Sequence, residues 1–327
     1  MVRVGIIGTG IMGAGHAHYI TDLIEGAQVS ALSDIDLDRA NKLAQELKTV
    51  KLVTNNIDEL INSPEVDAII IVSPDPLHFE HLRKVLKTDK PTLCDKPIAT
   101  SLEDAQTISN EIANKEAQTG KRQVVFGFMR RFDPTYHEIR ALLESGEYGK
   151  PLFVRVAGRN VSSPGITTPG LFTNIAIHDF DIYRWLFKSE WESIQSFYPN
   201  ATANAPEGLR DPLIFVAKMT NGIVLVEDVI ANDFYGFDTR AEVVCEKGSI
   251  EIGVLGDVVK RRDFNFESMK GGKMEPNWMK KFEPGYINEL KAWIKEIETG
   301  VPNPDFATHK DALIANQVAA MGAASIK

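Results

Sequence analysis

The stretch that decides the fold is Val2-Arg-Val-Gly-Ile-Ile-Gly-Thr-Gly-Ile-Met-Gly13. Its apolar start predicts a short buried strand, and the GxGxxG element that follows at once would open a helix. In this context the three glycines are typical of a dinucleotide-binding turn, in which the backbone approaches a pyrophosphate and the helix N-terminus holds it. A glycine-rich turn without a ligand is the alternative. We therefore expect cofactor contacts from Gly8, Gly10, Ile11, Met12 and Gly13.

Short apolar runs alternate with helical patterns over residues 1–122. The run Asp67–Ser73 is apolar without alternation, which is typical of a strand buried on both faces of a parallel sheet. Asp36 and Ser101 are good N-caps for two of the expected helices, and Val124–Phe128 closes the series. This alternation predicts an α/β domain over residues 1–122, with a doubly wound parallel sheet of the Rossmann type. The glycine turn at its start makes it the expected cofactor-binding domain.

The pattern changes in residues 123–327, for which we expect a second, α+β domain. Strand-like runs dominate from residue 194 to 252, and Thr220-Asn221-Gly222 between two of them is a tight-hairpin signal. We expect a large, mostly antiparallel sheet with helices on one face. A helix is predicted over 175–187, residues 262–285 are expected to be a loop, and two helices should end the chain.

Composition excludes several classes of protein. The 327 residues carry 36 Lys+Arg against 45 Asp+Glu, a net charge of −9 that argues against nucleic acid or anionic membrane as the main partner. Only two cysteines are present, which excludes a disulfide framework and fits a cytoplasmic protein. No apolar run approaches the roughly 20 residues of a membrane span. No His, Cys, Asp and Glu cluster has metal-binding spacing, so no metal is expected.

Asp34 ends the second expected strand, 21 residues after Gly13. A carboxylate there can accept hydrogen bonds from the adenosine ribose hydroxyls and would repel a 2′-phosphate. Its neighbours offer no basic group for such a phosphate, although Arg39 lies a few residues on. NAD is therefore favoured over NADP. The alternative is that Asp34 only caps the next helix, where Asp36 is the better cap.

Two polar segments follow buried strands, at the edge where open α/β sheets bind their ligands. Ser73-Pro74-Asp75-Pro76-Leu77-His78 follows one strand, and Cys94-Asp95-Lys96-Pro97 follows the next. An ammonium group there can bind a substrate hydroxyl or assist a neighbouring acid–base group, although a surface lysine at a strand exit is the simpler alternative. The expected contributors to the cofactor site are Ser73, Pro74, His78, Asp95 and Lys96.

With these motifs and a helix that carries His178-Asp-Phe-Asp181, the whole chain resembles the glucose–fructose oxidoreductase/inositol dehydrogenase/MocA family. It looks closest to the myo-inositol 2-dehydrogenase branch. The segments behind that narrower resemblance are Gly127-Phe-Met-Arg-Arg-Phe-Asp133, Gly158-Arg-Asn160, Leu209-Arg-Asp-Pro212 and Asn232-Asp-Phe-Tyr-Gly-Phe-Asp238.

The resemblance implies NAD-dependent oxidation of a cyclitol secondary alcohol to the ketone, most specifically of myo-inositol to 2-keto-myo-inositol. It implies His178 as the acid/base group and Lys96 as its helper, and it places Arg130, Asn160 and Tyr235 near the polyol. A histidine is a natural base for a hydroxyl proton at neutral pH. It also implies a homotetramer or homodimer that forms through the outer face of the second sheet.

Two positions depart from the family pattern. Asp95 stands where the family usually has Glu, which is one methylene longer. Asn174 stands four residues before His178, where inositol dehydrogenases usually have a carboxylate. Positions four apart share a helical face, so Asn174 is expected to act with His178 at the catalytic and substrate site. An amide cannot stabilise an imidazolium as a carboxylate does.

Other functions and roles remain open from the sequence. Within the enzyme class, the substrate could be another inositol isomer or an aldose. In a different class, the chain would be an NAD-binding sugar sensor without turnover, or a redox-neutral glycosidase that uses NAD transiently. His178 could instead be an ordinary core histidine, Arg130 a surface arginine and Tyr235 a loop aromatic.

Overall fold

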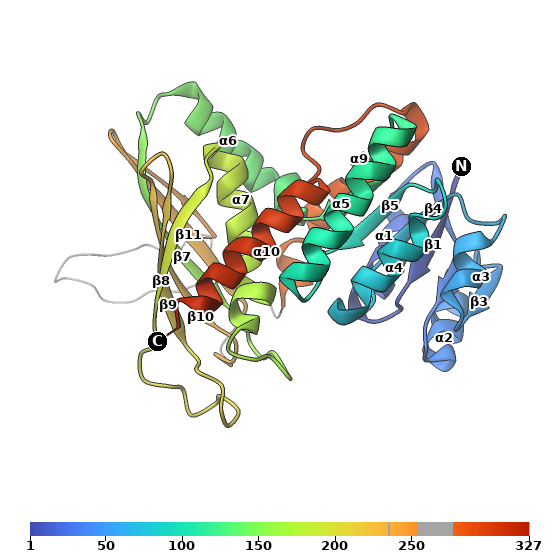
Figure 1. Ribbon diagram of the computed structural model, residues 1–327, viewed down its shortest axis with the longest axis horizontal. Helices are drawn as coiled ribbons and strands as arrows, with labels where there is room; N and C mark the ends of the chain where they lie inside the picture. The colour runs from blue at the N-terminus through green and yellow to red at the C-terminus, as the bar shows by residue number, and fades with distance from the viewer. Residues whose placement is uncertain (235, 254–276, 327) are drawn as a thin grey trace, which may run out of the picture. The chain divides into compact units, whose positions relative to one another are not determined.

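The computed structural model describes residues 1–234, 236–253 and 277–326 (Figure 1). Their contacts divide the chain into two compact units. The first unit holds Met1–Pro134 and Glu283–Gln317, and the second holds Thr135–Phe282 and Val318–Lys327. The sequence predicted two domains, 1–122 and 123–327, with one boundary between them. The two units have three boundaries along the chain, because residues 283–317 return to the first unit.

The first unit is built on a six-stranded sheet in the order β3-β2-β1-β4-β5-β6, with every pair parallel. The strands are β1 (Val2–Ile7), β2 (Ala27–Ser33), β3 (Leu52–Thr54), β4 (Ala68–Ile71), β5 (Thr92–Asp95) and β6 (Val124–Gly127). The helices are α1 (Ile11–Leu23), α2 (Leu37–Leu47), α3 (Ile57–Asn62), α4 (His78–Val85), α5 (Leu102–Thr119), α9 (Glu283–Thr299) and the start of α10 (His309–Ala324). This arrangement confirms the predicted doubly wound parallel sheet.

Local sequence signals account for many helix ends in this unit. The Asp36 side chain accepts a hydrogen bond from the Arg39 amide and caps α2. Ser101 caps α5 in the same way, and Gly120 ends that helix in the left-handed conformation. α9 closes the unit from far along the chain, because its apolar face, with Leu290 and Trp293, belongs to the same core as β1 and α1.

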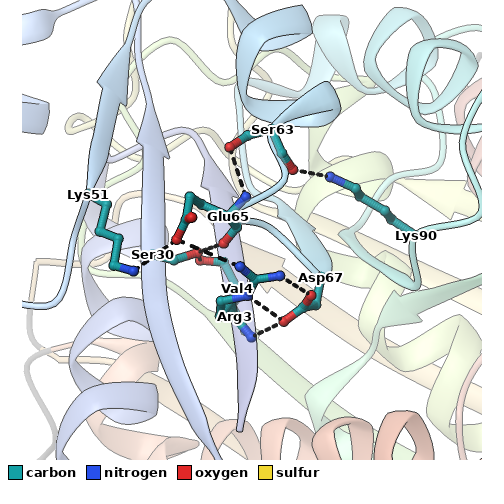
Figure 2. A network of polar contacts seen from close by, with 8 residues as sticks. All are labelled: Arg3, Val4, Ser30, Lys51, Ser63, Glu65, Asp67 and Lys90. Carbon is teal, nitrogen blue, oxygen red and sulfur yellow. Dashed lines mark hydrogen bonds and ion pairs between the residues drawn. The ribbon is translucent and has the colours of Figure 1, made fainter.

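The amino edge of this sheet carries a polar network, shown in Figure 2. Arg3 on β1 binds the Asp67 carboxylate through its amide and its guanidinium, at 2.7 to 2.9 Å. Lys51 donates to Glu65 at 2.9 Å, and the Ser30 hydroxyl donates to the Glu65 carbonyl at 2.7 Å. Apart from Ser30, which lies within β2, these residues stand at or just before the starts of strands, at the edge opposite to the segments that follow β1, β2, β4 and β5. The network therefore joins neighbouring strands away from the candidate site.

The second unit is built on a sheet in the order β12-β11-β7-β10-β9-β8. Only the pair β7 and β10 is parallel, so the prediction of a mostly antiparallel sheet is confirmed. The strands are β7 (Pro151–Arg159), β8 (Trp191–Phe197), β9 (Leu213–Met219), β10 (Val224–Ile230), β11 (Asp238–Cys245) and β12 (Ser249–Ile252). The helices are α6 (Pro134–Ser145), α7 (Ile177–Phe187), α8 (Trp278–Lys281) and the end of α10. As predicted, Gly222 turns the β9–β10 hairpin, with φ +91°.

Aromatic side chains join α7 to the second sheet. The Phe180 ring lies 5.5 Å from Phe215 and 5.8 Å from Trp191, and the indole N–H of Trp191 donates to the Phe180 carbonyl at 2.9 Å. The chain enters α7 through a π-helical turn, Leu171–Ala176, whereas the sequence predicted one regular helix from Ile175. The π turn also packs against this sheet, since Phe172 lies 5.6 Å from Phe215. This aromatic core fixes one side of α7 against the sheet.

The prediction of a loop over 262–285 is wrong at its C-terminal end, since α8 begins at Trp278 and α9 at Glu283. The cause is packing: Phe282 and Tyr286 are buried, so this polar stretch gains helix from tertiary contacts. The part of that loop before residue 277 lies outside the described residues.

Candidate functional site

The glycine turn after β1 has the geometry that a dinucleotide needs. Gly8 has φ +99°, and a Cβ there would meet the Val72 carbonyl at 2.6 Å. A Cβ on Gly13 would lie 1.9 Å from the Gly8 carbonyl oxygen, so α1 can start this close to β1 only with glycine. A Cβ on Gly10, in contrast, would meet nothing within 4 Å. Gly10 is also the N-cap of α1 and supplies no capping side chain. The helix start is therefore open to an anion.

Asp34 lies just beyond β2 and is 8% exposed. Its Oδ2 accepts from the Thr9 amide at 2.6 Å and the Thr9 hydroxyl at 2.7 Å, so it is joined to the glycine turn. Its Oδ1 accepts from the Asp36 amide at 2.9 Å and from Arg39 Nη2 at 2.6 Å. Burial acts to raise the pKa of Asp34, but the hydrogen bonds outweigh it and lower that pKa to about 2. The side chain is thus an ionised carboxylate at neutral pH, as ribose binding requires.

His78 joins the two segments that follow β4 and β5. Its Nδ1 lies 2.7 Å from the Pro97 carbonyl oxygen and its Nε2 lies 2.8 Å from the Ser73 carbonyl oxygen. The Ser73 hydroxyl lies 2.9 Å from Nδ1 of His81, the next histidine on α4. Both polar atoms of the buried His78 ring are therefore engaged by backbone. The contact between His78 and the cofactor stays a prediction. Because both ring nitrogens are engaged, such a contact would have to be made by the ring carbons.

Asp95 and Lys96 stand at the carboxyl end of β5, as the sequence predicted. The Lys96 amide donates to Asp95 Oδ1 at 2.8 Å, and the Lys96–Pro97 peptide bond is cis. Burial raises the pKa of the Asp95 carboxyl, while the neighbouring Lys96 charge acts to lower it. Pro74, after β4, is exposed at the same edge of the sheet.

Tyr286 is a candidate that the sequence analysis missed. It is 6% exposed, and burial raises the pKa of its hydroxyl well above the usual range, helped by the Asp95 and Glu289 charges. Arg130, only 4% exposed, acts on Tyr286 in the opposite direction. The first unit thus brings Asp95, Arg130 and Tyr286 into one electrostatic cluster. No motif marked Tyr286, because only the return of α9 to this unit places it there.

Asn174 and His178 lie in the second unit, on the π turn and on α7. Every residue from Ile175 to Tyr183 is buried except His178, which is half-buried, and Asn174 is exposed. An ordinary core histidine would share the burial of its neighbours. The two side chains therefore mark the accessible side of an otherwise buried segment. The expectation that they act together stays a prediction.

Three of the four segments behind the narrower resemblance, those around Asn160, Asp211 and Asn232, are bound to one another within the second unit. The Asp211 carboxylate accepts from the Ala231 amide at 3.0 Å and from the Asn232 amide group at 3.1 Å. Asn232 in turn accepts from the Ser163 amide at 3.3 Å, and Asn160 donates to the Ser163 hydroxyl at 3.1 Å. Asp211 and Asn232 thus position the chain around Asn160. Tyr235 lies outside the described residues.

The described residues hold no group of three or more His, Cys, Asp or Glu side chains that could bind a metal ion. Over the same part of the chain, no helix is long and apolar enough to cross a membrane.

Comparisons with known proteins agree over both units. Residues 2–122 match the model of an oxidoreductase family with an NAD-binding Rossmann fold, and residues 136–251 match the GFO/IDH/MocA C-terminal domain. An inositol 2-dehydrogenase of Rhodococcus erythropolis is 34% identical, over 100% of this chain and 92% of its own. Inositol 2-dehydrogenase 4 of Saccharopolyspora erythraea is 32% identical, over 91% of this chain and 86% of its own.

Solved structures show the same similarity. The myo-inositol dehydrogenase of Lactobacillus casei, crystallised in complex with NAD(H) and myo-inositol, matches with a TM-score of 0.87 and 31% identity. The match covers 99% of this chain and 94% of that one. A probable dehydrogenase of Thermotoga maritima also has a TM-score of 0.87, with 27% identity, over 99% of this chain and 96% of its own.

Proposed function

Because the chain belongs to the GFO/IDH/MocA family of oxidoreductases with an NAD-binding Rossmann fold, we propose that it oxidises an inositol with NAD. The preferred substrate is myo-inositol, and the product is the 2-keto compound. This substrate follows from relatives named inositol 2-dehydrogenase at 30% to 34% identity and from the myo-inositol complex of the Lactobacillus casei protein.

The observation that carries the proposal furthest is the exposure pattern around His178. From Ile175 to Tyr183 all the other residues are buried, whereas the His178 side chain stays half-buried and Asn174, just before this run, is exposed. A half-buried histidine suits a base, because it can reach a substrate hydroxyl and still exchange protons near neutral pH. Lys96, at the end of β5, would donate a hydrogen bond to the same hydroxyl and favour its ionised form.

The cofactor fits the residues present in the first unit. The amides of Ile11, Met12 and Gly13 at the start of α1 would hold its pyrophosphate, over the open space at Gly10. The ionised Asp34 would bind the adenosine ribose. When bound, the nicotinamide ring accepts the hydride from the alcohol carbon.

An uncharged polyol needs several hydrogen-bonding groups to select which hydroxyl reacts. Arg130, Asn160, Asn174 and Tyr235 are the proposed contacts. Arg130 is supported by its place in the cluster with Asp95 and Tyr286, and Asn160 by the bonded segments around it. Tyr286 joins this proposed set because it lies close to Arg130: its neighbour Gly285 packs against Met129, where a Cβ would lie 2.8 Å from the Met129 carbonyl oxygen. Its hydroxyl can donate or accept a hydrogen bond.

The test is NADH formation by the purified protein with myo-inositol, scyllo-inositol, D-chiro-inositol, glucose and galactose, with NADP in parallel. We expect the highest kcat/KM for myo-inositol with NAD. Lys96→Ala and His178→Ala should each lower kcat by at least 100-fold while NAD still binds, because general acid–base groups contribute about 10²–10⁴-fold.

The alternative functions give different results in the same test. Turnover of an aldose alone would identify a sugar dehydrogenase. NAD binding without NADH formation from any of these compounds would favour the sensor. Action on glycosides with no net NADH would favour the glycosidase.

A further inference from the structure

Asp34 is already saturated with donors. A carboxylate offers about four acceptor positions, and the described residues place four hydrogen bonds on this one. A ribose hydroxyl that binds Asp34 must therefore displace one of them.

The four donors differ in how easily they leave. Two are backbone amides, of Thr9 and Asp36, and the third is the hydroxyl of Thr9, which is 2% exposed. These three are fixed by the glycine turn and the start of α2. The fourth is Arg39, whose side chain is 47% exposed while that of Asp34 is 5% exposed. A long, half-exposed side chain can move into solvent at little cost, because exposed ion pairs contribute little.

We propose that Arg39 is a selectivity residue for the cofactor, which occupies the ribose-binding position of Asp34 until NAD displaces it. This inference rests on the proposed NAD site. Arg39 competes with the ribose hydroxyls for Oδ1 of Asp34, so it weakens NAD binding. After displacement its guanidinium lies beside the ribose, where it would meet a 2′-phosphate.

The two effects shift cofactor preference in the same direction. With NADP, the 2′-phosphate faces repulsion from Asp34, and Arg39 is the group that offsets it, through charge-assisted hydrogen bonds. Asp34 makes the protein bind NAD more tightly than NADP, and Arg39 therefore makes this difference in affinity smaller. Ile35, which is 92% exposed, and Ser33 carry no charge that could take over this role.

The test compares Arg39→Leu with Lys42→Leu, which removes an exposed cation from the same helix that is not a donor to Asp34. The dissociation constants of NAD and NADP would be measured by calorimetry without polyol, at one ionic strength. Arg39→Leu should bind NAD about two- to fivefold more tightly, the effect of removing an exposed ion pair. It should bind NADP about tenfold more weakly, and Lys42→Leu should change the ratio of the two constants little.

Unchanged or weaker NAD binding in Arg39→Leu would overturn the competition with ribose, and unchanged NADP binding would overturn the role toward the phosphate. If Lys42→Leu changed the two dissociation constants as much as Arg39→Leu does, the effect would come from the net charge of the helix. That result would also overturn the inference. A wild-type protein that binds NAD, with no difference in Arg39→Leu, contradicts this inference alone. A wild-type protein that binds neither cofactor contradicts the proposed function too. Thermal unfolding of each variant verifies that it folds.

Discussion

Asn174 is the residue where this chain departs most from the resemblance that its sequence suggests. Replacing it by Asp would put a carboxylate on the accessible segment four residues before His178. A carboxylate favours the protonated imidazole, which cannot act as the base. Asn174→Asp should therefore move the acidic limb of the kcat/KM profile to higher pH, by about one unit. Rates from pH 5 to 10 measure this shift, and an unmoved limb would show that the two side chains do not interact.

His16 on α1 should make the folded state sensitive to mild acid. Burial lowers its pKa to about 4, against about 6.5 in an unfolded chain. Below pH 6.5 the unfolded chain binds a proton that the native state refuses, so stability falls as the pH falls toward 4. The expected loss at pH 5 relative to pH 7.5 is about 2 kcal/mol.

Urea unfolding at the two pH values checks this prediction. Between pH 7.5 and pH 5, the free energy of unfolding should fall by about 2 kcal/mol less in His16→Leu than in the wild type, even if the variant is less stable overall. His81, whose pKa burial also lowers to about 4, should leave a second, similar loss in that variant. A pH dependence equal to that of the wild type would contradict the assignment to His16.

Residues whose role depends on their own neighbours in sequence were predictable. Gly8, Gly13, Asp36 and Ser101 act within a turn or a helix end, and the structure gives each the expected geometry. Tyr286 was not predictable, because Asp95 and Arg130, the two site residues that act on it, lie more than 150 residues away in sequence. The bond from Arg39 to Asp34 was also missed, although the two are five residues apart, since exposed side chains carry no pattern.

Two glycine-to-alanine variants at the start of α1, Gly13→Ala and Gly10→Ala, distinguish helix packing from cofactor binding. Gly13→Ala would put a methyl group 1.9 Å from the Gly8 carbonyl, so the helix must move away from β1. It should cost about 1–3 kcal/mol of stability and also lose NAD affinity. Gly10→Ala would meet nothing within 4 Å, so it should lose NAD affinity and at most about 1 kcal/mol of stability, the cost of alanine at an N-cap.

Urea unfolding and NAD titration of both variants separate packing from binding. If Gly10→Ala bound NAD as tightly as the wild type, the open space at Gly10 would not be the place where the pyrophosphate lies.

Strands and regular helices were predictable because burial on one or both faces leaves a period in the sequence. The π-helical turn at Leu171–Ala176 leaves no such period, because it depends on how Phe172 packs against Phe215 on β9. The start of α9 was missed for a related reason, since its buried residues pack against a part of the chain that precedes them by more than 100 positions.

At the scale of the whole molecule, the second sheet predicts self-association. The register puts Val216 on β9 opposite Val226 on β10, and both lie on the more exposed side of their strands. In Figure 1, α6 and α7 lie on one side of this sheet. Val226 is 37% exposed, and Phe197 at the sheet edge is 47% exposed. On the same face these apolar side chains lie beside charged ones, among them the Arg155–Glu242 and Arg159–Asp228 ion pairs. Exposed apolar side chains together with arginine are typical of an interface between protein chains. We expect a homodimer or homotetramer that buries this face.

Val226→Glu should reduce the mass in light scattering toward the 36.3 kDa of one chain. Val301→Glu, the same change at a residue that is 67% exposed in the first unit, should leave the assembly intact. A wild-type monomer, or an unchanged mass in Val226→Glu, would contradict this interface.

The fold class was predictable at this scale, whereas the division of the chain was not. Sequence composition changes once, near residue 122, but the contacts of α9 assign a C-terminal segment to the first unit. Which segments share a core depends on long-range packing, and no local pattern records it.

In the proposed reaction, a hydride passes from C2 of myo-inositol to NAD. The most direct measurement uses myo-inositol with deuterium at C2 and mass spectrometry of the reduced nicotinamide. We expect reduced cofactor one mass unit heavier than with unlabelled substrate, together with the 2-keto product. Unlabelled reduced cofactor would place the oxidation at another carbon, and no reduced cofactor at all would contradict the dehydrogenase.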